Sequence, residues 1–293
     1  MGKRKKTTNK LEKMQYLLFT LILLSLLSCR VGKVNSSEQG KSDRTRYFPK
    51  SIDRVETIPS KENVWVFILA GQSNMAGRGF VEPQDTLPSE RVLTIKANGQ
   101  LVFAKEPLHF YEPTLTGLDC GLSFGKNLIK YISDSISILL LPTAVGGSSV
   151  GQWLGDSLYR NVQLLSNFRD KVQIGKKYGQ VKAILWHQGE SDANANDIPQ
   201  YKERLSKLFE KFRAIVGNET LPIMIGELGS FSKDAENWQL INQMIKSYSV
   251  TDNNTAIVST ADLKDKGDKV HFNSEGQRIM GQRFAYEYIK KFK

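Results

Sequence analysis

The sequence predicts an α/β fold in which a parallel central sheet is covered by helices on both faces. Five short apolar runs alternate with five longer amphipathic segments between residues 63 and 293. The apolar runs lack the two-residue alternation of a half-solvated strand, which indicates strands buried on both faces. Regular alternation of such strands with helices is typical of parallel βαβ units.

The expected elements are distributed over the whole of residues 63–293. The strands are expected at Val64–Ala70, Ile136–Leu141, Val181–Trp186, Leu221–Gly226 and Ala256–Thr260. The helices are expected at Leu122–Ile132, Leu158–Gln173, Pro199–Val216, Glu236–Ser249 and Ser274–Lys290. The segment Glu82–Tyr111 is less regular, and we expect loops there with a small hairpin around Asn98-Gly99.

The first 29 residues are expected to be a signal peptide. Basic residues precede an apolar run from Tyr16 to Leu27, which is shorter than the about 20 residues needed to span a bilayer. The segment Leu26-Leu27-Ser28-Cys29 resembles a bacterial lipobox, whose cysteine becomes the lipidated first residue of the mature chain. An ordinary signal peptide with an incidental cysteine is the alternative. We therefore expect an exported protein, either anchored through Cys29 and facing the periplasm or cell surface, or secreted.

Composition narrows the possible partners and cofactors. The formal net charge is +11, but much of it lies in the basic leader, and no basic run with interleaved aromatics follows residue 60. No nucleic-acid partner is therefore expected, and membrane contact is expected only through the lipid anchor. Residues 30–62 are polar and predict a tether to a domain at 63–293. With 3 histidines and 2 cysteines, the usual zinc-site spacings are absent, so no metal or other cofactor is expected.

The first of four polar motifs is Gly71-Gln72-Ser73-Asn74-Met75, which directly follows the first expected strand. In a parallel sheet the ligand crevice lies at the carboxyl ends of the strands. A serine at a strand-to-helix turn presents its hydroxyl and its own N–H to that crevice, which suits a nucleophile that also stabilises an oxyanion. A serine that merely caps the next helix would occupy the same position.

Two further motifs follow later strands. Gly146-Gly147-Ser148-Ser149 contains glycines that allow backbone N–H groups to approach a ligand, although a simple turn has the same composition. The motif at residues 186–192 offers an imidazole, carboxylates and the amide of Gln188, which is a donor type found in oxyanion holes. Both motifs are expected at the same edge of the sheet as Ser73.

The fourth motif, Asp268-Lys269-Val270-His271-Phe272, precedes the last expected helix. A catalytic serine needs a base, and His109, His187 and His271 are the histidines of the chain. An aspartate three residues before a histidine can hold one ring nitrogen and leave the other for the serine proton. His271 is therefore the expected base, with helix capping or packing as its alternative role, and His109 is expected at the surface or lining the crevice.

Together these motifs resemble the sialate O-acetylesterase and acetylxylan esterase group of SGNH hydrolases, in the family order and across nearly the whole domain. The resemblance implies a flavodoxin-like three-layer α/β/α fold, metal-free ester hydrolysis and removal of O-acetyl groups from carbohydrate. It implies Ser73 as nucleophile, Asp268 orienting His271, and an oxyanion held by Gln188 and by the N–H groups of Gly147 and Ser73. Supporting roles are expected for Gln72, Asn74 and Glu190, and Glu190 is the alternative partner of His271.

Two departures from the family pattern and three rival interpretations accompany this resemblance. Many SGNH hydrolases have asparagine where this chain has Gln188. In the loop Gly117–Gly121, this chain has Asp119 and Cys120 where the family pattern predicts a smaller turn with glycine or proline.

The segment Gly147–Gly151 matches the G-x-S-x-G nucleophile elbow of α/β-hydrolases, which would make Ser149 the nucleophile. Glu190 and Asp192 are too close in sequence for a glycosidase pair on opposite sides of a sugar. A non-catalytic carbohydrate-binding protein on the same fold is the remaining alternative.

Overall fold

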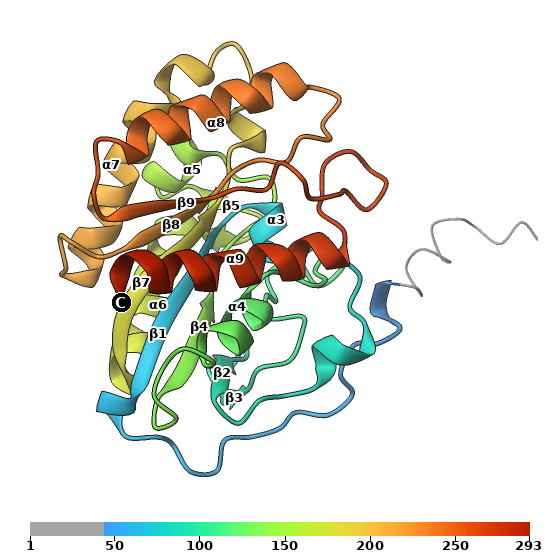
Figure 1. Cartoon of the computed structure of the whole chain (residues 1–293), viewed down its shortest axis with the longest axis vertical. Coiled ribbons are helices and arrows are strands. Elements are labelled where there is room, and N and C mark those ends of the chain that lie inside the picture. Colours follow the sequence, from blue (N-terminus) through green and yellow to red (C-terminus); the bar gives the residue numbers. More distant parts are fainter. Residues whose placement is uncertain (1–43) are drawn as a thin grey trace, which may run out of the picture. The chain divides into compact units, whose positions relative to one another are not determined.

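A seven-stranded sheet forms the centre of the described chain, residues 44–293 of a computed structural model (Figure 1). Its order is β3-β2-β4-β1-β7-β8-β9, and every neighbouring pair is parallel except β2 and β3. The strands are β1 (Val64–Gly71), β2 (Val92–Ile95), β3 (Leu101–Phe103), β4 (Ser137–Pro142), β7 (Gln180–His187), β8 (Ile223–Gly226) and β9 (Thr255–Val258). The five expected strands are β4-β1-β7-β8-β9 in space, which is the flavodoxin-like order 2-1-3-4-5.

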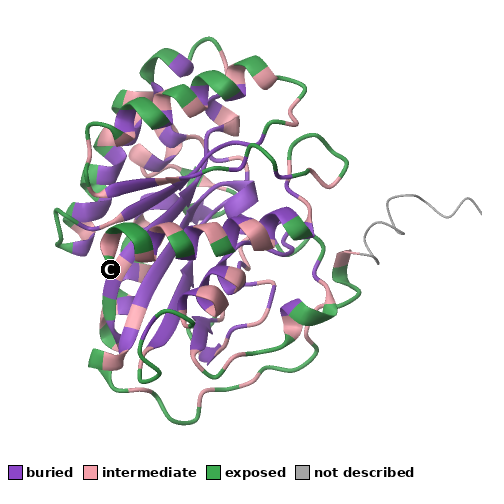
Figure 2. Cartoon of the chain, in the orientation of Figure 1, coloured by how far each residue is buried: buried purple, intermediate pink, exposed green. Residues whose placement is uncertain are grey.

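Helices cover both faces of this sheet (Figures 1 and 2). One face packs against α5, α6, α7 and α8, and the other packs against α4 and α9. The helices are α3 (Ser73–Ala76), α4 (Gly121–Leu128), α5 (Val150–Leu154), α6 (Leu164–Tyr178), α7 (Ile198–Val216), α8 (Ala235–Ser249) and α9 (Ser274–Phe292), with 3-10 turns η1 (Lys61–Asn63), η2 (Pro83–Thr86) and η3 (Glu190–Asp192). The predicted three-layer fold is confirmed.

The central strand β1 shows why the apolar runs lack a two-residue pattern. Val66 and Ile68 belong to the core beneath α6 and α7, whereas Phe67 and Leu69 belong to the core beneath α4 and α9. Both faces of the strand are therefore excluded from water. Burial of each large apolar side chain stabilises the fold by about 1.5–3 kcal/mol. The core on the side of α6 and α7 also contains edge-to-face aromatic contacts, such as Trp153 with Trp186 at 5.6 Å between ring centroids.

Two local predictions turn out differently from each other. The hairpin expected around Asn98-Gly99 is confirmed, and its strands β2 and β3 extend the main sheet beyond β4. The helix expected at Leu158–Gln173 is wrong at its start, because β5 (Leu158–Tyr159) and β6 (Val162–Gln163) form a separate hairpin before α6. Arg160 and Asn161 form its turn with φ of 47° and 62°, the left-handed conformation that tight hairpins require.

Residues 44–62, assigned from sequence to the polar tether, make contacts with the domain. Phe103 N–H donates to the Asp53 carbonyl at 2.9 Å, Lys105 pairs with the Asp53 carboxylate at 2.6 Å, and Arg54 forms a bridge with Val102. The expected signal peptide, Cys29 and the rest of the tether lie outside the described residues. Within residues 44–293, no helix has the length and apolar character to cross a membrane.

Candidate active site

The turn after β1 places Ser73 beside the end of β7. Gly71 pairs with His187 on β7, and its φ of +134° belongs to a region that side chains avoid. A Cβ at Gly71 would lie 2.1 Å from the His187 carbonyl oxygen, so only glycine fits. The next residue, Gln72, donates its N–H to that same carbonyl at 2.9 Å. This turn brings Ser73 to the first position of α3, at the carboxyl edge of the sheet.

Ser73, His271 and Asp268 form a chain of hydrogen bonds. The Nε2 atom of His271 lies 3.0 Å from Ser73 Oγ, and Nδ1 lies 2.7 Å from Asp268 Oδ2. The other Asp268 oxygen accepts backbone N–H bonds from Val270 at 3.0 Å and His271 at 2.8 Å. The expected i, i+3 contact between carboxylate and ring is therefore present, and Glu190 forms no hydrogen bond or ion pair with the His271 ring. The arrangement has the geometry of a nucleophile, a base and an orienting carboxylate.

The surroundings keep the imidazole neutral and the carboxylate ionised. Burial lowers the pKa of His271 below its ordinary value, with Lys266 and Arg78 acting in the same direction and Asp268 opposing them. Partial burial acts to raise the pKa of Asp268, but hydrogen bonds from His271 and Val270 outweigh it and lower the pKa to about 2. A neutral ring beside an anionic carboxylate is the state that can accept the Ser73 proton.

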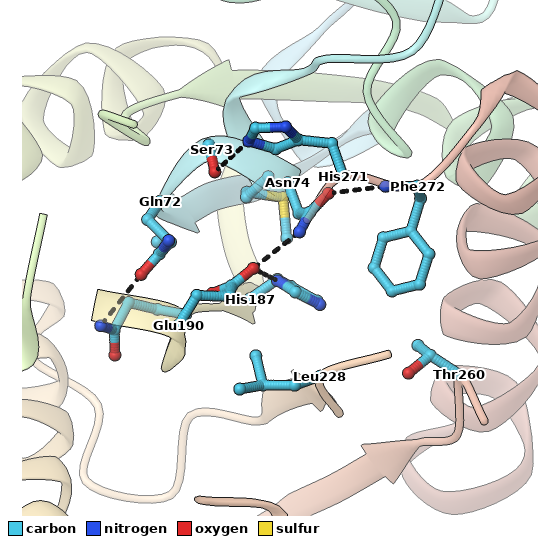
Figure 3. A network of polar contacts seen from close by, with 12 residues as sticks. Gln72, Ser73, Asn74, His187, Glu190, Leu228, Thr260, His271 and Phe272 are labelled. Atoms are coloured by element: carbon cyan, nitrogen blue, oxygen red, sulfur yellow. Dashed lines mark hydrogen bonds and ion pairs between the residues drawn. The ribbon is translucent and has the colours of Figure 1, made fainter. Parts of the chain in front are cut away.

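Asn74, the residue after Ser73, holds the backbone on both sides of His271 (Figure 3). Its Nδ2 donates to the Val270 carbonyl at 3.1 Å, and its Oδ1 accepts the Phe272 N–H at 3.1 Å. Nδ2 also donates to Glu190 Oε1 at 2.6 Å. One fully buried amide thus ties the segment that carries the nucleophile to the segment that carries the base, across almost 200 residues of sequence.

In the view of Figure 3, Glu190 and His187 lie below this amide, and Glu190 also lines the pocket in front of Ser73. Glu190 Oε1 lies 3.7 Å from His187 Nδ1, and His187 Nε2 bonds the Glu227 carbonyl at 3.0 Å. His187 is fully buried, which lowers its pKa. These contacts assign His187 to the interior and Glu190 to the support of Asn74.

Gly147 and Gln188 occupy different environments, although both were expected to donate to an oxyanion. Gly147 has a φ of +82° and lines the pocket in front of Ser73. Gln188 is fully buried, and its Nε2 faces Asp192, the Ser148 carbonyl and Gln72 Oε1. The donor role of Gln188 stays a prediction, and this arrangement does not favour it.

The pocket in front of Ser73 carries several cations that sequence inspection missed. Its wall includes Arg44, Arg78, Arg160 and Lys266, together with Thr114 and Leu115. Arg78 pairs with Glu112 at 2.8 Å inside the wall, and Arg160 contacts the same carboxylate. These residues come from segments between the motifs, so no local pattern marks them. The polar wall suits a hydroxylated substrate.

Ser149, the nucleophile of the rival G-x-S-x-G pattern, caps a helix in the structure. Ser149 caps α5, because its Oγ accepts the Gln152 N–H at 3.2 Å and Gln152 Oε1 accepts the Ser149 N–H at 2.9 Å. All three histidines lie in the described part of the chain, and none of them bonds Ser149.

Asp119 and Cys120 are fully buried and do not line the pocket. His109 is 2% exposed and bonded to Asp119, so its expected surface or crevice position is wrong.

Comparisons with known proteins identify the family of this chain. A family model described as "carbohydrate esterase, sialic acid-specific acetylesterase" matches residues 63–290. A probable carbohydrate esterase of Arabidopsis thaliana is 30% identical over 251 residues, which cover 78% of this chain and 91% of the relative. The X-ray structure of that Arabidopsis protein has a TM-score of 0.70 at 26% identity and covers 79% of this chain and 100% of its own.

Two more distant structures share the fold. The crystal structure of NanS has a TM-score of 0.62 at 17% identity, covering 80% of this chain and 98% of its own. A carbohydrate acetylesterase from Xanthomonas citri has a TM-score of 0.58 at 18% identity, covering 78% of this chain and 56% of its own. From the family match over nearly the whole domain, we conclude that the chain belongs to the carbohydrate esterase family of sialic acid-specific acetylesterases.

Proposed function

We propose that this carbohydrate esterase removes O-acetyl groups from its carbohydrate substrate by a covalent serine mechanism. The observation that supports this most directly is the 3.0 Å contact between Ser73 Oγ and His271 Nε2, with Asp268 on the other ring nitrogen. In the proposed roles, Ser73 is the nucleophile, His271 is the base and Asp268 orients the ring. Family membership supports an acetylated carbohydrate as the substrate class.

The first half of the reaction forms an acetyl-enzyme. His271 Nε2 takes the Ser73 proton while Oγ bonds to the acetyl carbon, and the carbonyl π electrons move to the oxygen. When the carbonyl re-forms, the bond between the acetyl carbon and the sugar oxygen breaks. The sugar oxygen takes the proton from His271 and leaves as an alcohol, so the proton count balances.

The second half releases acetate. Water gives a proton to His271 Nε2 as its oxygen bonds to the acetyl carbon, and the C–O bond to Ser73 breaks on collapse of the second tetrahedral intermediate. Ser73 recovers its proton from His271, and acetic acid ionises in solution. Asp268 keeps the ring orientation and stabilises the imidazolium in both halves without itself becoming protonated.

The nucleophile assignment is tested with nitrophenyl acetate, which requires no knowledge of the natural glycan. Ser73→Ala should fall to background, a loss on the order of a million-fold, because the covalent route disappears. Ser149→Ala, the matched serine control, should retain most activity, and a serine-directed phosphonate should label the peptide that contains Ser73. Labelling of Ser149 with retained activity in Ser73→Ala would transfer the role to Ser149, and absence of both activity and labelling would favour a carbohydrate-binding protein.

The substrate assignment is tested separately by acetate release from a panel of acetylated glycans that includes xylan, pectin and sialic acid. Release from at least one glycan, lost in Ser73→Ala, is the expected result. Hydrolysis of nitrophenyl acetate without release from any glycan would leave an esterase whose substrate is not a carbohydrate.

We also propose that the protein is exported and anchored through a lipid on Cys29, from the basic and apolar order of its first 29 residues. Metabolic labelling with a fatty acid should mark the wild-type chain and not Cys29→Ala. Equal labelling of both chains would exclude Cys29 as the lipidated residue. Cleavage of an unlabelled chain with release to the medium would instead indicate secretion.

A further inference from the structure

One wall of the active-site pocket comes from a segment that precedes the part of the chain matched by the family model. That match begins at residue 63, whereas Arg44 lines the same pocket as Ser73 and His271. In Figure 1 the blue segment that follows residue 44 runs along the domain to β1. The pocket has a volume of about 470 Å³, within the range of about 300–1,000 Å³ of small-molecule sites. A ligand that fills it contacts both the nucleophile and Arg44.

The Arg44 guanidinium group is held in place by the protein. Nη1 donates to the Thr116 carbonyl, and Nη2 donates to the Pro113 carbonyl at 3.3 Å. The guanidinium carbon also lies 5.3 Å from the centre of the Phe48 ring. An arginine has more N–H donors than these two carbonyls accept, so donors are left for a ligand. Because the group is positioned before a ligand arrives, binding costs less side-chain entropy.

The other cations of the pocket wall have carboxylate partners within the domain. Arg78 pairs with Glu112 at 2.8 Å, and Arg160 contacts the same carboxylate. Lys266 Nζ lies 3.5 Å from Asp268. One carboxylate is therefore shared by two arginines, and the wall carries more positive charge than these partners neutralise.

Arg44 differs from these cations because, among residues 44–293, it forms an ion pair with no carboxylate. Glu190, which also lines the pocket, forms no ion pair with any cation of the described wall. Burial lowers the pKa of Arg44, and the charge of Arg78 lowers it further. Burial also lowers the pKa of Lys266, and both arginines act in the same direction. Since arginine stays protonated in proteins, the cluster favours an anionic ligand.

The chemical group that matches Arg44 is a carboxylate on the sugar. A planar guanidinium group binds carboxylates through paired N–H donors. The acetyl ester is uncharged, and so are xylose and glucose units, whereas uronic and sialic acids each carry a carboxylate. An acetylated acidic sugar therefore supplies the negative charge that the wall lacks.

We infer that Arg44, from the segment before the family match, binds the carboxylate of an acetylated acidic sugar and makes this segment part of the substrate site. This inference rests on the proposed esterase function and deepens it. The carboxylate belongs to the sugar and does not change during acyl transfer. The contact is therefore equally strong before and during the reaction, so its loss should raise KM and leave kcat nearly unchanged.

The test compares Arg44→Met with wild type in the full-length protein. The substrates are acetylated sialic acid, acetylated pectin fragments, neutral acetylated xylo-oligosaccharides and nitrophenyl acetate. The KM for an acidic glycan should rise by about 10-fold or more, while kinetics with both neutral substrates stay constant. Whichever acidic glycan is hydrolysed identifies the source of the carboxylate. The matched control is Arg46→Met, because Arg46 lies over the Tyr47 ring at 5.2 Å and does not line the pocket.

A second readout measures binding without turnover of a glycan. Galacturonate and N-acetylneuraminate, added as competitors of nitrophenyl acetate, should inhibit wild type more strongly than glucose does. This difference should shrink by about 10-fold in Arg44→Met and should weaken as salt rises, because a partly exposed ion pair is screened. If Arg44→Met does not fold, Arg44→Lys keeps the charge without the planar donors and should show a smaller loss of the same kind.

The outcomes distinguish this inference from the function on which it rests. An equal loss with nitrophenyl acetate and with acidic glycans would show that Arg44 only supports the loop at Pro113–Thr116, and would overturn the inference. Unchanged inhibition by both sugar acids in Arg44→Met, or inhibition by a sugar phosphate alone, would overturn it as well. A wild-type protein that hydrolyses no ester and is not labelled at Ser73 would refute the proposed function. Calorimetric binding of a sugar acid, lost in Arg44→Met, would still support the binding role of Arg44 in that case.

Discussion

The described chain contains two histidine–aspartate pairs of almost equal geometry in opposite surroundings. His271 Nδ1 lies 2.7 Å from Asp268 Oδ2, and His109 Nδ1 lies 2.8 Å from Asp119 Oδ2. The side chains of the first pair are 20% and 37% exposed, and those of the second are 2% and 0% exposed. The bond lengths therefore do not tell the two pairs apart.

The surroundings of the second ring nitrogen, Nε2, distinguish the two pairs. His271 Nε2 faces Ser73 Oγ in an open pocket, whereas His109 Nε2 is buried without a hydrogen-bond partner in residues 44–293. Asp119 also accepts the Gly121 N–H at 2.6 Å, at the first residue of α4. The buried pair therefore fixes the loop before α4, and a histidine–aspartate contact has catalytic meaning only where a nucleophile and an opening accompany it.

The largest effect expected from this comparison is on turnover in the exposed pair. Asp268→Asn should lower kcat by up to about four orders of magnitude, because the ring loses its orienting anion and its tautomer. Thermal unfolding should change little, since the carboxylate is partly exposed. The matched control is Glu190→Gln, which should remain far more active. A crippled Glu190→Gln beside a near-normal Asp268→Asn would show that Glu190 is the orienting group.

The same substitution in the buried pair should lower the stability of the fold and leave turnover nearly unchanged. Asp119 accepts from His109 with one oxygen and from Gly121 with the other, so Asp119→Asn leaves one acceptor oxygen where there were two. The free energy of unfolding, measured in urea, should fall by about 1–3 kcal/mol. The kcat of the folded fraction should stay within a few-fold of wild type. A thousand-fold loss of kcat in folded protein would make this pair part of the catalytic machinery.

A smaller loss is expected from the residue that joins the two halves of the exposed site. Asn74→Ala removes the hydrogen bonds to Val270 and Phe272 on either side of His271. We expect kcat to fall by about 10–10² because the base is less well placed, with KM nearly unchanged. Steady-state kinetics checks this, and the control is Asn237→Ala in α8, whose side chain bonds Asp234 at 2.9 Å and does not line the pocket in front of Ser73. A change confined to KM would argue against a positioning role.

The smallest effect concerns the pH at which His271 becomes a base. Activity should rise with pH as the ring loses its proton, with a midpoint below about 6.5 because burial lowers the pKa of His271. Lys266 also lowers this pKa, so Lys266→Met removes a positive charge and should move the acid limb of kcat/KM to higher pH. A shift to lower pH would contradict the assignment of that limb to His271.

The sequence by itself determined the features that depend on short-range geometry. The alternation of apolar runs and amphipathic segments was enough for the fold class, because strands buried on both faces must be apolar throughout. The three-residue spacing of Asp268 and His271 favoured their contact over the alternative with Glu190, since such a short separation lets the carboxylate turn back to the ring. The position of Ser73 followed from its place directly after the first expected strand, because the carboxyl ends of parallel strands border the ligand crevice.

Only the tertiary structure decided the features whose partners come from several strands. The Nε2 atom of Gln188 faces Asp192, Ser148 and Gln72, and no spacing within one motif reveals that these partners surround its amide. The burial of His109 depends on a loop ten residues away. A side chain's hydrogen-bond partners are set by packing between distant segments, so the residue type predicts what it can donate and the fold decides where.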